Sequence, residues 1–278
     1  MKTEQLEQLL PEILRIAKQA GVKIMEVYEA GFEVETKADK SPVTTADLAA
    51  HDLIEKELNK LLPLFPILSE ESLGVSYTER EKRETYWLVD PLDGTKEFIK
   101  RYDSFTVNIA LIHKNESILG VIYAPALGIS YYACRGHGSY KESTKVKSVP
   151  HKITARKIPK KTVFAGSRSH PGKTLSAFLE NYKNDLGDYE LVSMGSSLKM
   201  CMVAEGLVDL YPRLWGTSEW DTAAAHCIVD EAGGSLVKID LSPLLYNTKD
   251  SLLNPYFFTI GDNNVDWVKY LPKEALNC

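Results

Sequence analysis

The sequence has few cysteines, and they form no pattern that would bind a metal ion or build a disulfide framework. None of the four stands in a CxxC motif or at a Cys/His ligand spacing; they are Cys134, Cys201, Cys227 and Cys278. Scattered thiols of this kind are typical of buried or inert cysteines in a reducing compartment, because disulfides persist in oxidising ones. We therefore expect a cytoplasmic protein.

The sequence also lacks an excess of positive charge. It has 33 lysines and arginines against 38 aspartates and glutamates, a formal net charge of −5. Nucleic acid polymers and anionic membrane surfaces attract basic proteins, so the composition gives no electrostatic support for either partner. An anionic substrate would have to be neutralised locally.

No segment is typical of an export signal or of a membrane span. The amino terminus carries Glu4, Glu7 and Glu12 where a signal peptide would need an apolar core. The uncharged stretch "SILGVIYAPALGISYYAC", residues 117–134, approaches membrane-spanning length. Because Pro125 and Gly128 lie near its middle, it predicts a hairpin of two strands instead.

The first part of the chain mixes helices with consecutive strands. Its 278 residues, 44% of them hydrophobic, are enough for one large domain or two modest ones. Apolar residues recur at helical spacing over residues 4–29, and a second amphipathic helix follows Asp47. Four strands without intervening helices come next, which favours antiparallel pairing; they are "YWLVD", "FTVNIALI", "ILGVIYA" and "ISYYACR".

The second part alternates strands and helices after a polar, lysine-rich link at residues 141–161. "TVFAGSRSH", "ELVSMG", "VDLYP" and "SLVKI" are expected strands, and the segments between them include three expected helices, the last beginning near Asp221 and ending before Gly233 and Gly234. We therefore predict an α+β half at residues 1–145 and an α/β half at residues 146–278. No internal repeat is present.

The stretch "DPLDGTKEF", residues 90–98, places two acids directly after a buried strand. Asp90 ends the strand and Asp93 follows three residues later; Pro91 fixes a turn and Gly94 permits an unusual backbone angle. Both carboxylates are then expected to converge on one point. Buried carboxylates are costly unless something positive neutralises them.

Other acids stand at comparable places. Glu70 and Glu71 end the apolar run "LFPILSEE", and Asp47 and Asp221 stand at helix starts. Carboxylates together with a backbone carbonyl suit a hard cation such as Mg²⁺. A carboxylate that bridges two ions, for which Asp90 is the candidate, would allow in-line phosphoryl displacement. Bound metal ions, and not surface lysines, would then attract an anionic substrate.

Each of these signals has a structural explanation when taken alone. Glu70 and Glu71 could be a solvated loop, Asp221 an N-cap, and "DPLDGT" a simple turn. A turn, however, requires neither two acids after a buried strand nor the following Thr95. The combination therefore favours a metal site.

The stretches "SEE", "DPLDGTKEF" and "WDTAA", in this order, resemble the two signatures of the inositol monophosphatase superfamily, whose members are metal-dependent and typically lithium-inhibited phosphatases. The resemblance covers nearly the whole chain. It is strongest to the 3′(2′),5′-bisphosphate nucleotidase branch, through "YWLVDPLDGTKEFIKR", "SRSH", "GSSLKMCMVAEGLVDLYPR" and "SEWDTAA". Inositol monophosphatases usually have a threonine-asparagine pair where this chain has Lys96 and Glu97.

The resemblance implies a layered αβαβα sandwich, a mixed α/β fold, and a site with two or three Mg²⁺ ions. The implied metal ligands are Glu70, Asp90, the Leu92 carbonyl, Asp93 and Asp221. Asp47 and Thr95 match the catalytic pair that orients the attacking water, together with Glu70. Asp93, Gly94 and Thr95 match a phosphate-binding turn at a helix start. No covalent intermediate is implied.

The implied substrate contacts in the second half are His170, Ser196, Lys199 and Asp221. His170 could equally be a surface loop residue, and a lysine on an amphipathic helix usually reaches solvent. Arg168 and Arg213 could hold phosphate or form structural ion pairs. The remaining histidines match no role; they are His51, His113, His137, His151 and His226.

The resemblance therefore predicts a phosphatase that converts adenosine 3′,5′-bisphosphate, and its sulfated form, to products that lack the 3′-phosphate, a role in sulfur assimilation. The alternatives are an inositol monophosphatase or broad sugar-phosphate phosphatase, and a nucleotide-binding protein without turnover. The intact set of acids argues against the last. A small phosphorylated nucleotide is the expected partner of a monomer or homodimer, with membrane association at most peripheral on the inner face of the cell membrane.

Overall fold

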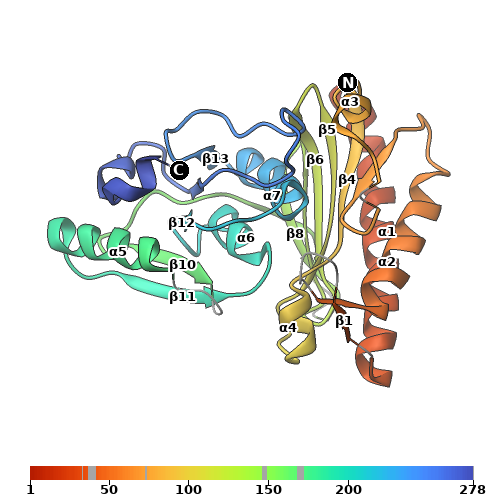
Figure 1. Ribbon diagram of the computed structural model, residues 1–278, viewed down its shortest axis with the longest axis horizontal. Coiled ribbons are helices and arrows are strands. Elements are labelled where there is room, and N and C mark those ends of the chain that lie inside the picture. The colour runs from red at the N-terminus through yellow and green to blue at the C-terminus, as the bar shows by residue number, and fades with distance from the viewer. Residues whose placement is uncertain (33, 37–41, 73, 146–148, 168–171, 278) are drawn as a thin grey trace.

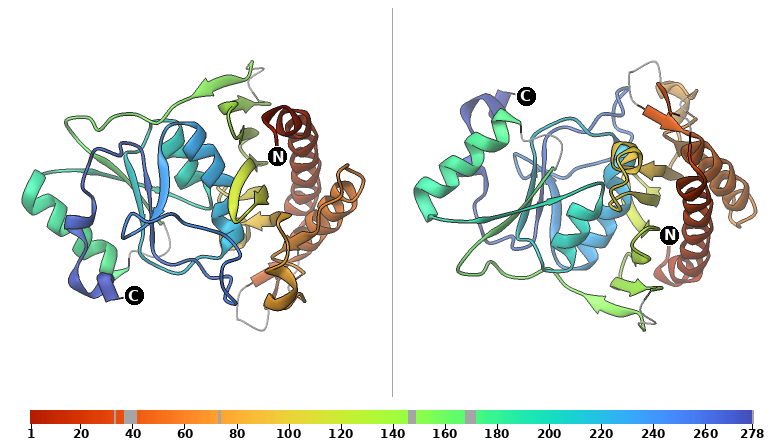
Figure 2. Two further views of the ribbon diagram at one scale, coloured as in Figure 1. Left: turned by 90° about the horizontal axis from the view of Figure 1, so that it is seen from above. Right: turned by 90° about the horizontal axis from the view of Figure 1, so that it is seen from below.

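A computed structural model describes residues 1–32, 34–36, 42–72, 74–145, 149–167 and 172–277. Two β-sheets alternate with three layers of helices (Figure 1). The views from above and below show the same succession, with the first two helices on one outer side and the C-terminal end on the other (Figure 2). This arrangement confirms the layered αβαβα fold.

The first outer layer consists of α1 (Thr3–Ala30) and α2 (Thr45–Leu58). Both helices pack their apolar faces against the first sheet, where Ile13, Ile16 and Ala17 of α1 are fully buried. α1 ends at Gly31, whose φ of 93° is costly for other residues. Both helices agree with the apolar periodicity of the sequence.

The first sheet has seven strands in sequential order. β3 pairs with β4 in parallel, and the other neighbours are antiparallel. Residues 117–134 form the β6–β7 hairpin, as predicted. The strands are β3 (Ile67–Ser69), β4 (Thr85–Asp93), β5 (Thr106–His113), β6 (Glu116–Ala124), β7 (Ile129–Cys134), β8 (Gly138–Ser143) and β9 (His151–Ile153).

The second sheet has five strands in the order β11-β10-β12-β14-β13. β10 pairs in parallel with β11 and β12, whereas β14 is antiparallel to both of its neighbours. The expected strand-helix alternation is present, and β14 is an additional strand. The elements are β10 (Val163–Ser167), α5 (Lys173–Leu186), β11 (Glu190–Met194), α6 (Leu198–Ala204), β12 (Leu210–Arg213), α7 (Glu219–Glu231), β13 (Ser235–Lys238) and β14 (Phe257–Ile260).

Helices α6 and α7 form the layer between the two sheets. Ala224, Ala225 and Ile228 of α7 are buried, and the helix lies close against β6 because Gly120 has no side chain. A Cβ at Gly120 would collide with the Ala224 carbonyl oxygen. This close packing fixes the start of α7 beside the end of β4.

Several short elements complete the described chain. They are β1 (Val34–Thr36), β2 (Pro42–Thr44), α3 (Tyr77–Arg80), α4 (Thr95–Ile99) and the 3₁₀ helices η1 (Val268–Tyr270) and η2 (Lys273–Asn277). No helix among the described residues combines the length and the apolar character needed to cross a bilayer. Cys134, Cys201 and Cys227 are buried free thiols, and Cys278 lies outside the described residues.

The first sheet extends beyond the boundary expected at residue 145. β9 lies within the polar link and pairs with β8. The second sheet begins only at Val163. The division into two separate halves at residues 145 and 146 stays a prediction.

Candidate active site

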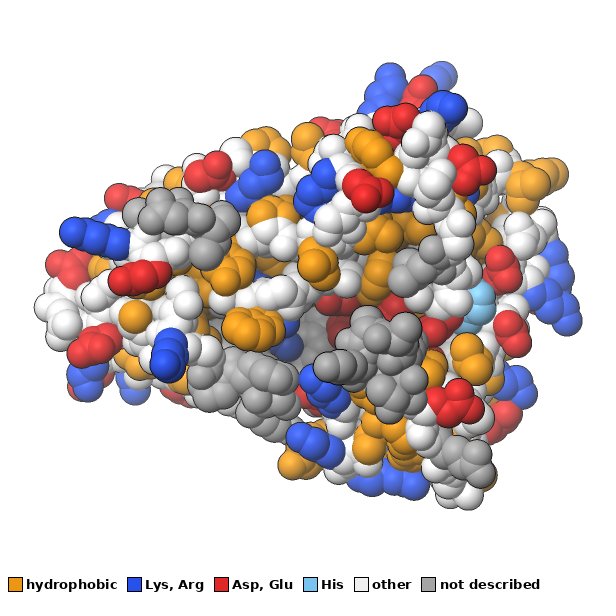
Figure 3. Space-filling model, viewed as in Figure 1, with side chains coloured by type: hydrophobic (Ala, Val, Ile, Leu, Met, Phe, Trp, Pro, Cys, Tyr) orange, Lys and Arg blue, Asp and Glu red, His pale blue; other side chains and the backbone are white. Residues whose placement is uncertain are grey.

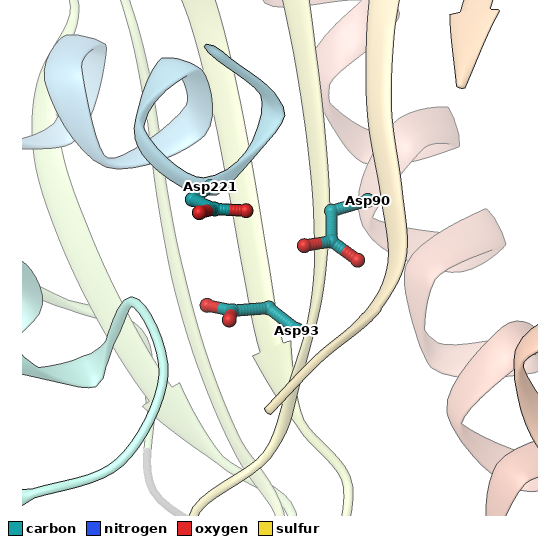
Figure 4. Close-up of side chains that lie close together, drawn as sticks. All are labelled: Asp90, Asp93 and Asp221. Carbon is teal, nitrogen blue, oxygen red and sulfur yellow. The ribbon is translucent and has the colours of Figure 1, made fainter. Parts of the chain in front are cut away.

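The end of β4 brings two carboxylates together. Antiparallel pairing with β5 is regular up to Asp90 and shifts before Asp93, where Pro91 interrupts the ladder because it has no N–H group. The Leu92 N–H donates to Asp90 Oδ1 at 3.1 Å, which closes the turn. Both carboxylates then point to the same side of the strand, as the sequence predicted (Figure 4).

The start of α7 supplies a third carboxylate. Ser218 is the N-cap, and Asp221, three residues later, accepts the Ser218 N–H at 3.0 Å. The interpretation of Asp221 as an N-cap is therefore wrong by three positions, although it does take part in capping. One carboxylate oxygen from each of Asp90, Asp93 and Asp221 lies within 4.8 Å of the others (Figure 4).

This cluster is electrostatically costly without a cation. Burial, reinforced by Glu70, Asp93 and Asp221, raises the pKa of Asp90 well above its usual range. Burial and the charges of Asp93 and Glu70 raise the pKa of Asp221 to about 8. Burial also raises the pKa of Asp93, which the Lys199 charge offsets in part. Three carboxylates at this spacing fit a hard divalent cation, which would neutralise them.

Glu70 and Leu92 lie next to the cluster. The Glu70 N–H donates to the Val89 carbonyl at 3.1 Å, so the β3–β4 pairing holds Glu70 beside the end of β4. Its charge contributes to the raised pKa of Asp90. The Leu92 carbonyl oxygen lies 3.4 Å from the Thr95 hydroxyl oxygen. A carboxylate and a carbonyl are thus available at the edge of the cluster.

Asp47 and Thr95 form a pair just beyond the end of β4. Asp47 caps α2: its Oδ2 accepts the Thr44 N–H at 2.7 Å and the Thr44 hydroxyl at 2.6 Å. Its other oxygen, Oδ1, accepts the Thr95 hydroxyl at 3.1 Å. Thr95 begins α4 directly after Gly94, whose φ is 90°. Burial raises the pKa of Asp47. The sequence placed both residues near the site, and the structure brings them into contact.

A cleft opens from this cluster toward the second half of the chain, and acidic side chains are visible in a hollow of the surface (Figure 3). Its wall includes Ser196 and Lys199 from the expected substrate contacts, Arg213, which we considered as a phosphate partner, and Gly94. The lining residues are Asp93, Gly94, Lys96, Glu97, Ser196, Ser197, Lys199, Met200, Tyr211, Arg213, Thr217, Asp221, Thr222 and Phe257.

Lys199 does not extend into solvent as a lysine on an amphipathic helix usually does. It is 6% exposed, and its Nζ donates to the carbonyls of Met194 at 3.2 Å and Ser196 at 2.6 Å. Burial lowers the pKa of Lys199 to about 8. The third N–H direction is not used by these two carbonyls, so one donor is available to the cleft.

Arg213 is held by backbone groups of a loop. Its guanidinium donates to the carbonyls of Trp215 at 3.2 Å and Gly216 at 2.9 Å, and to the Tyr211 hydroxyl at 3.3 Å. These acceptors are uncharged, so this part of the structure does not show the ion pair that we considered. His170 and Arg168 lie outside the described residues.

Sequence reasoning missed two buried polar residues at the cluster. The Ser197 N–H donates to Asp93 Oδ2 at 2.6 Å, and Asn108 Nδ2 donates to the same oxygen at 3.4 Å. Both residues are 1% exposed. The available signal was Asn108 itself, a polar residue in the middle of the apolar strand "FTVNIALI".

Most histidines are engaged elsewhere by structural neighbours. Nδ1 of His51 pairs with Ser69, that of His113 with Thr85, that of His137 with Glu7 and that of His226 with Tyr246. No described contact brings these four rings to the carboxylate cluster, so their roles stay unassigned.

Comparisons with known proteins identify the family of the chain. A model of the inositol monophosphatase family matches residues 5–263. The chain is 45% identical over 251 residues to the 3′(2′),5′-bisphosphate nucleotidase CysQ of Escherichia coli strain K12, covering 90% of this chain and 98% of the relative. The enzyme of the same name from Haemophilus influenzae is 40% identical, with 94% and 96% covered.

Solved structures show the same likeness. CysQ from Bacteroides thetaiotaomicron, a bacterial member of the inositol monophosphatase family, superposes with a TM-score of 0.76 at 40% identity, covering 88% of this chain and 94% of that one. An IMPase from Thermotoga maritima gives a TM-score of 0.76 at 25% identity, with 95% and 96% covered. A family match over most of the sequence and relatives at 40 to 45% identity show that this chain belongs to the inositol monophosphatase family.

Proposed function

We propose that this protein is a metal-dependent 3′(2′),5′-bisphosphate nucleotidase that hydrolyses adenosine 3′,5′-bisphosphate to AMP and phosphate in sulfur assimilation. The name shared by the relatives at 40 to 45% identity supports the substrate. The single observation that supports the chemistry is the convergence of Asp90, Asp93 and Asp221 within 4.8 Å, with Asp93 and Asp221 lining a cleft.

Five groups are proposed to hold two or three Mg²⁺ ions, with Asp90 as the bridging ligand. They are the carboxylates of Glu70, Asp90, Asp93 and Asp221 and the carbonyl of Leu92. Bound there, the ions supply positive charge that neutralises the cluster and Lewis acidity toward phosphoryl oxygens. The donor set consists of oxygens alone, which is what Mg²⁺ selects.

Thr95 and Asp47 are proposed to orient the attacking water, with Glu70 on the side of the cluster. The Thr95 hydroxyl donates its single proton to Asp47 Oδ1, so its lone pairs are left to accept a hydrogen bond from water. In this arrangement the water oxygen attacks phosphorus and the bond from phosphorus to the ribose 3′ oxygen breaks. The 3′ oxygen keeps the electron pair of that bond and, in the net reaction, takes up the proton that the water gives up, so a free 3′ hydroxyl remains. Water itself is the nucleophile, so no covalent enzyme intermediate forms.

Asp93, Gly94 and Thr95 are proposed to receive the phosphate being removed. Gly94 adopts φ 90°, and a Cβ there would lie 3.4 Å from Ser196 Cβ, so the turn keeps open backbone next to the cleft. The first N–H groups of a helix have no partner within that helix and can donate to an anion. α4 begins at Thr95.

The second half is proposed to recognise the leaving group. Ser196 and Lys199 line the cleft beyond the cluster, Asp221 lines it as a member of the cluster, and His170 completes the set expected from the sequence. A nucleotide leaving group offers hydroxyls and a second phosphate, for which the free donor of Lys199 is suited. An inositol leaving group offers hydroxyls alone.

Phosphate release from adenosine 3′,5′-bisphosphate and from inositol 1-phosphate, measured side by side with Mg²⁺ and then with a chelator, tests this function. We expect kcat/KM for the nucleotide to be at least a hundredfold higher, on the order of 3 kcal/mol of transition-state discrimination. Equal rates, or faster inositol phosphate turnover, would support the broad phosphatase instead. Chelator-resistant turnover would contradict the metal site, and no turnover on either substrate would support a binding protein.

We further propose a cytoplasmic location, at most peripheral on the inner face of the cell membrane, and a monomer or homodimer. The balance of charge supports an association with the membrane that is at most peripheral, since the chain has no excess of basic residues to bind an anionic surface. Cell fractionation and light scattering test these two points.

A further inference from the structure

Three buried polar side chains form a hydrogen-bond network with Asp93, which is proposed as a metal ligand. Thr106 and Asn108 belong to β5, whereas Ser197 precedes α6, so the group joins the two halves of the chain. All three are at most 1% exposed. None of them matches a residue that the sequence motifs assigned to the site.

Local backbone geometry brings Ser197 to this position. Ser196 adopts φ 47°, and Gly195 lies so close to the loop before β5 that a Cβ there would be 2.6 Å from the Ser104 carbonyl oxygen. Only a glycine fits this approach. The turn directs the Ser197 N–H at Asp93 Oδ2, at 2.6 Å, and its hydroxyl at β5.

The hydrogen bonds form a chain with one possible direction when Asp93 is ionised. An ionised carboxylate only accepts, so Asn108 must present its Nδ2–H group to Asp93 Oδ2, at 3.4 Å. Asn108 Oδ1 then faces Ser197 Oγ at 3.0 Å and requires a donor. Ser197 has one hydroxyl proton and gives it to Asn108, so Thr106 Oγ1, at 2.9 Å, donates to Ser197.

This chain therefore runs Thr106 to Ser197 to Asn108 to Asp93, with every donor pointing toward the carboxylate. Successive hydrogen bonds of the same direction polarise one another in a low-dielectric interior. Both Asn108 and the Ser197 N–H bind Oδ2. Among the described hydrogen bonds, none is donated to Oδ1, which is the oxygen left to face a cation.

We infer that Ser197 is a positioning residue whose hydroxyl, through Asn108, orients the Asp93 carboxylate for cation binding. The inference rests on the proposed function, in which Asp93 is a metal ligand. Removing a hydrogen-bond partner of a ligating carboxylate typically lowers the metal affinity tenfold or more. Ser197→Ala keeps the backbone N–H to Asp93 and removes only the hydroxyl, so it isolates this contribution.

The test is calorimetric titration of the metal-free, full-length protein with Mn²⁺, a redox-stable stand-in for Mg²⁺ at an all-oxygen site. We expect Ser197→Ala to weaken Mn²⁺ binding about tenfold. Ser104→Ala is the matched control: Ser104 is 5% exposed, borders the same turn, and its Oγ has no hydrogen-bond partner among the described residues. This control should bind Mn²⁺ like the wild type.

A double-mutant cycle with Asn108→Ala separates a positioning role from general destabilisation. If Ser197 acts through Asn108, Ser197→Ala should cost little additional affinity in the Asn108→Ala background. Additive losses, or wild-type affinity in Ser197→Ala, would overturn the inference. Should Ser197→Ala fail to fold, Asn108→Ala alone must weaken Mn²⁺ binding, and unchanged affinity there would overturn it.

The same titration distinguishes this inference from the proposed function. A wild-type protein that binds no Mn²⁺ contradicts the metal site as a whole. A wild-type protein that binds Mn²⁺ with the same affinity as Ser197→Ala contradicts only the role of Ser197.

Discussion

Thr95 and Asp47 stand 48 positions apart in the sequence, yet the Thr95 hydroxyl donates to Asp47 Oδ1 at 3.1 Å. The contact joins the first turn of α4 to the first turn of α2 across the end of β4. Because Asp47 also caps α2 through Oδ2, its position is fixed before any substrate binds. This pair is therefore preorganised for the water-orienting role that we propose for it.

Thr95→Ala should lower kcat by about a hundredfold to a thousandfold, the usual effect of losing one positioned hydrogen-bonding group at a reacting centre. Thr95→Ser keeps the hydroxyl and is expected to retain most of the activity. Steady-state kinetics on adenosine 3′,5′-bisphosphate, together with Mn²⁺ titration, check both variants. Unchanged kcat in Thr95→Ala would remove Thr95 from the mechanism.

Asp221→Asn is predicted to lose activity and yet to make the metal-free protein more stable. The asparagine side chain can still accept the Ser218 N–H, whereas the repulsion with Asp93 and Glu70 disappears. Thermal unfolding in the presence of a chelator should give a higher Tm for the variant than for the wild type. Asp262→Asn is the control, because the native contacts lower the pKa of Asp262 and so favour its charged form; its Tm should not rise.

The stability of the metal-free protein should fall as the pH rises between about 4 and 8. The ordinary pKa of an aspartate is 3.8, and burial and acidic neighbours raise that of Asp221 to about 8 in the folded state. In this window the folded state binds more protons than the unfolded state, so the free energy of unfolding decreases with pH. Tm measured against pH in a chelator checks the sign.

Mg²⁺ should reverse this trend, because metal binding requires the deprotonated carboxylates. The increase in Tm on adding Mg²⁺ is therefore expected to be larger at pH 8 than at pH 5. Equal increases at both pH values would mean that these carboxylates do not bind the ion.

The family resemblance also predicts inhibition by lithium. Millimolar Li⁺ should reduce Mg²⁺-supported phosphate release, while the same concentration of Na⁺ should leave it unchanged. Turnover that is insensitive to Li⁺ would mean that this property does not transfer from the family to this chain.

The sequence predicted the convergence of Asp90 and Asp93 because the residues proposed as ligands stand in short motifs. Asp90, Leu92 and Asp93 lie in one turn, where local residue types decide the geometry. β8, β9 and β14 were missed: β9 and β14 are only three or four residues long, and β8 and β9 lie in or beside the stretch interpreted as a polar link. Their pairing depends on tertiary contacts and not on periodicity.

The support behind Asp93 could not be predicted for a related reason. Ser197 and Asp93 are 104 positions apart, and their contact depends on the left-handed Ser196 and the close approach at Gly195. A serine in "GSSLK" is compatible with a cap, a turn or a substrate contact. Only the fold decides among them.

Lys199 provides the sharpest test of how the second half recognises the leaving group. Two of its three donors are committed to the carbonyls of Met194 and Ser196, which leaves one for a substrate anion. A hydrogen bond to a charged group contributes about 1.5 to 3 kcal/mol, so Lys199→Met should raise KM for adenosine 3′,5′-bisphosphate by about tenfold or more.

The same variant should change KM for inositol 1-phosphate much less, because that leaving group carries no second phosphate. Lys141→Met is the control, since Lys141 is also partly buried and is paired with Glu205 outside the cleft. It should leave both KM values unchanged. If Lys199→Met instead raises KM equally for both substrates and lowers kcat, the lysine acts through the Ser196 carbonyl on the turn that supports Asp93. The selectivity for nucleotides must then come from other residues of the cleft.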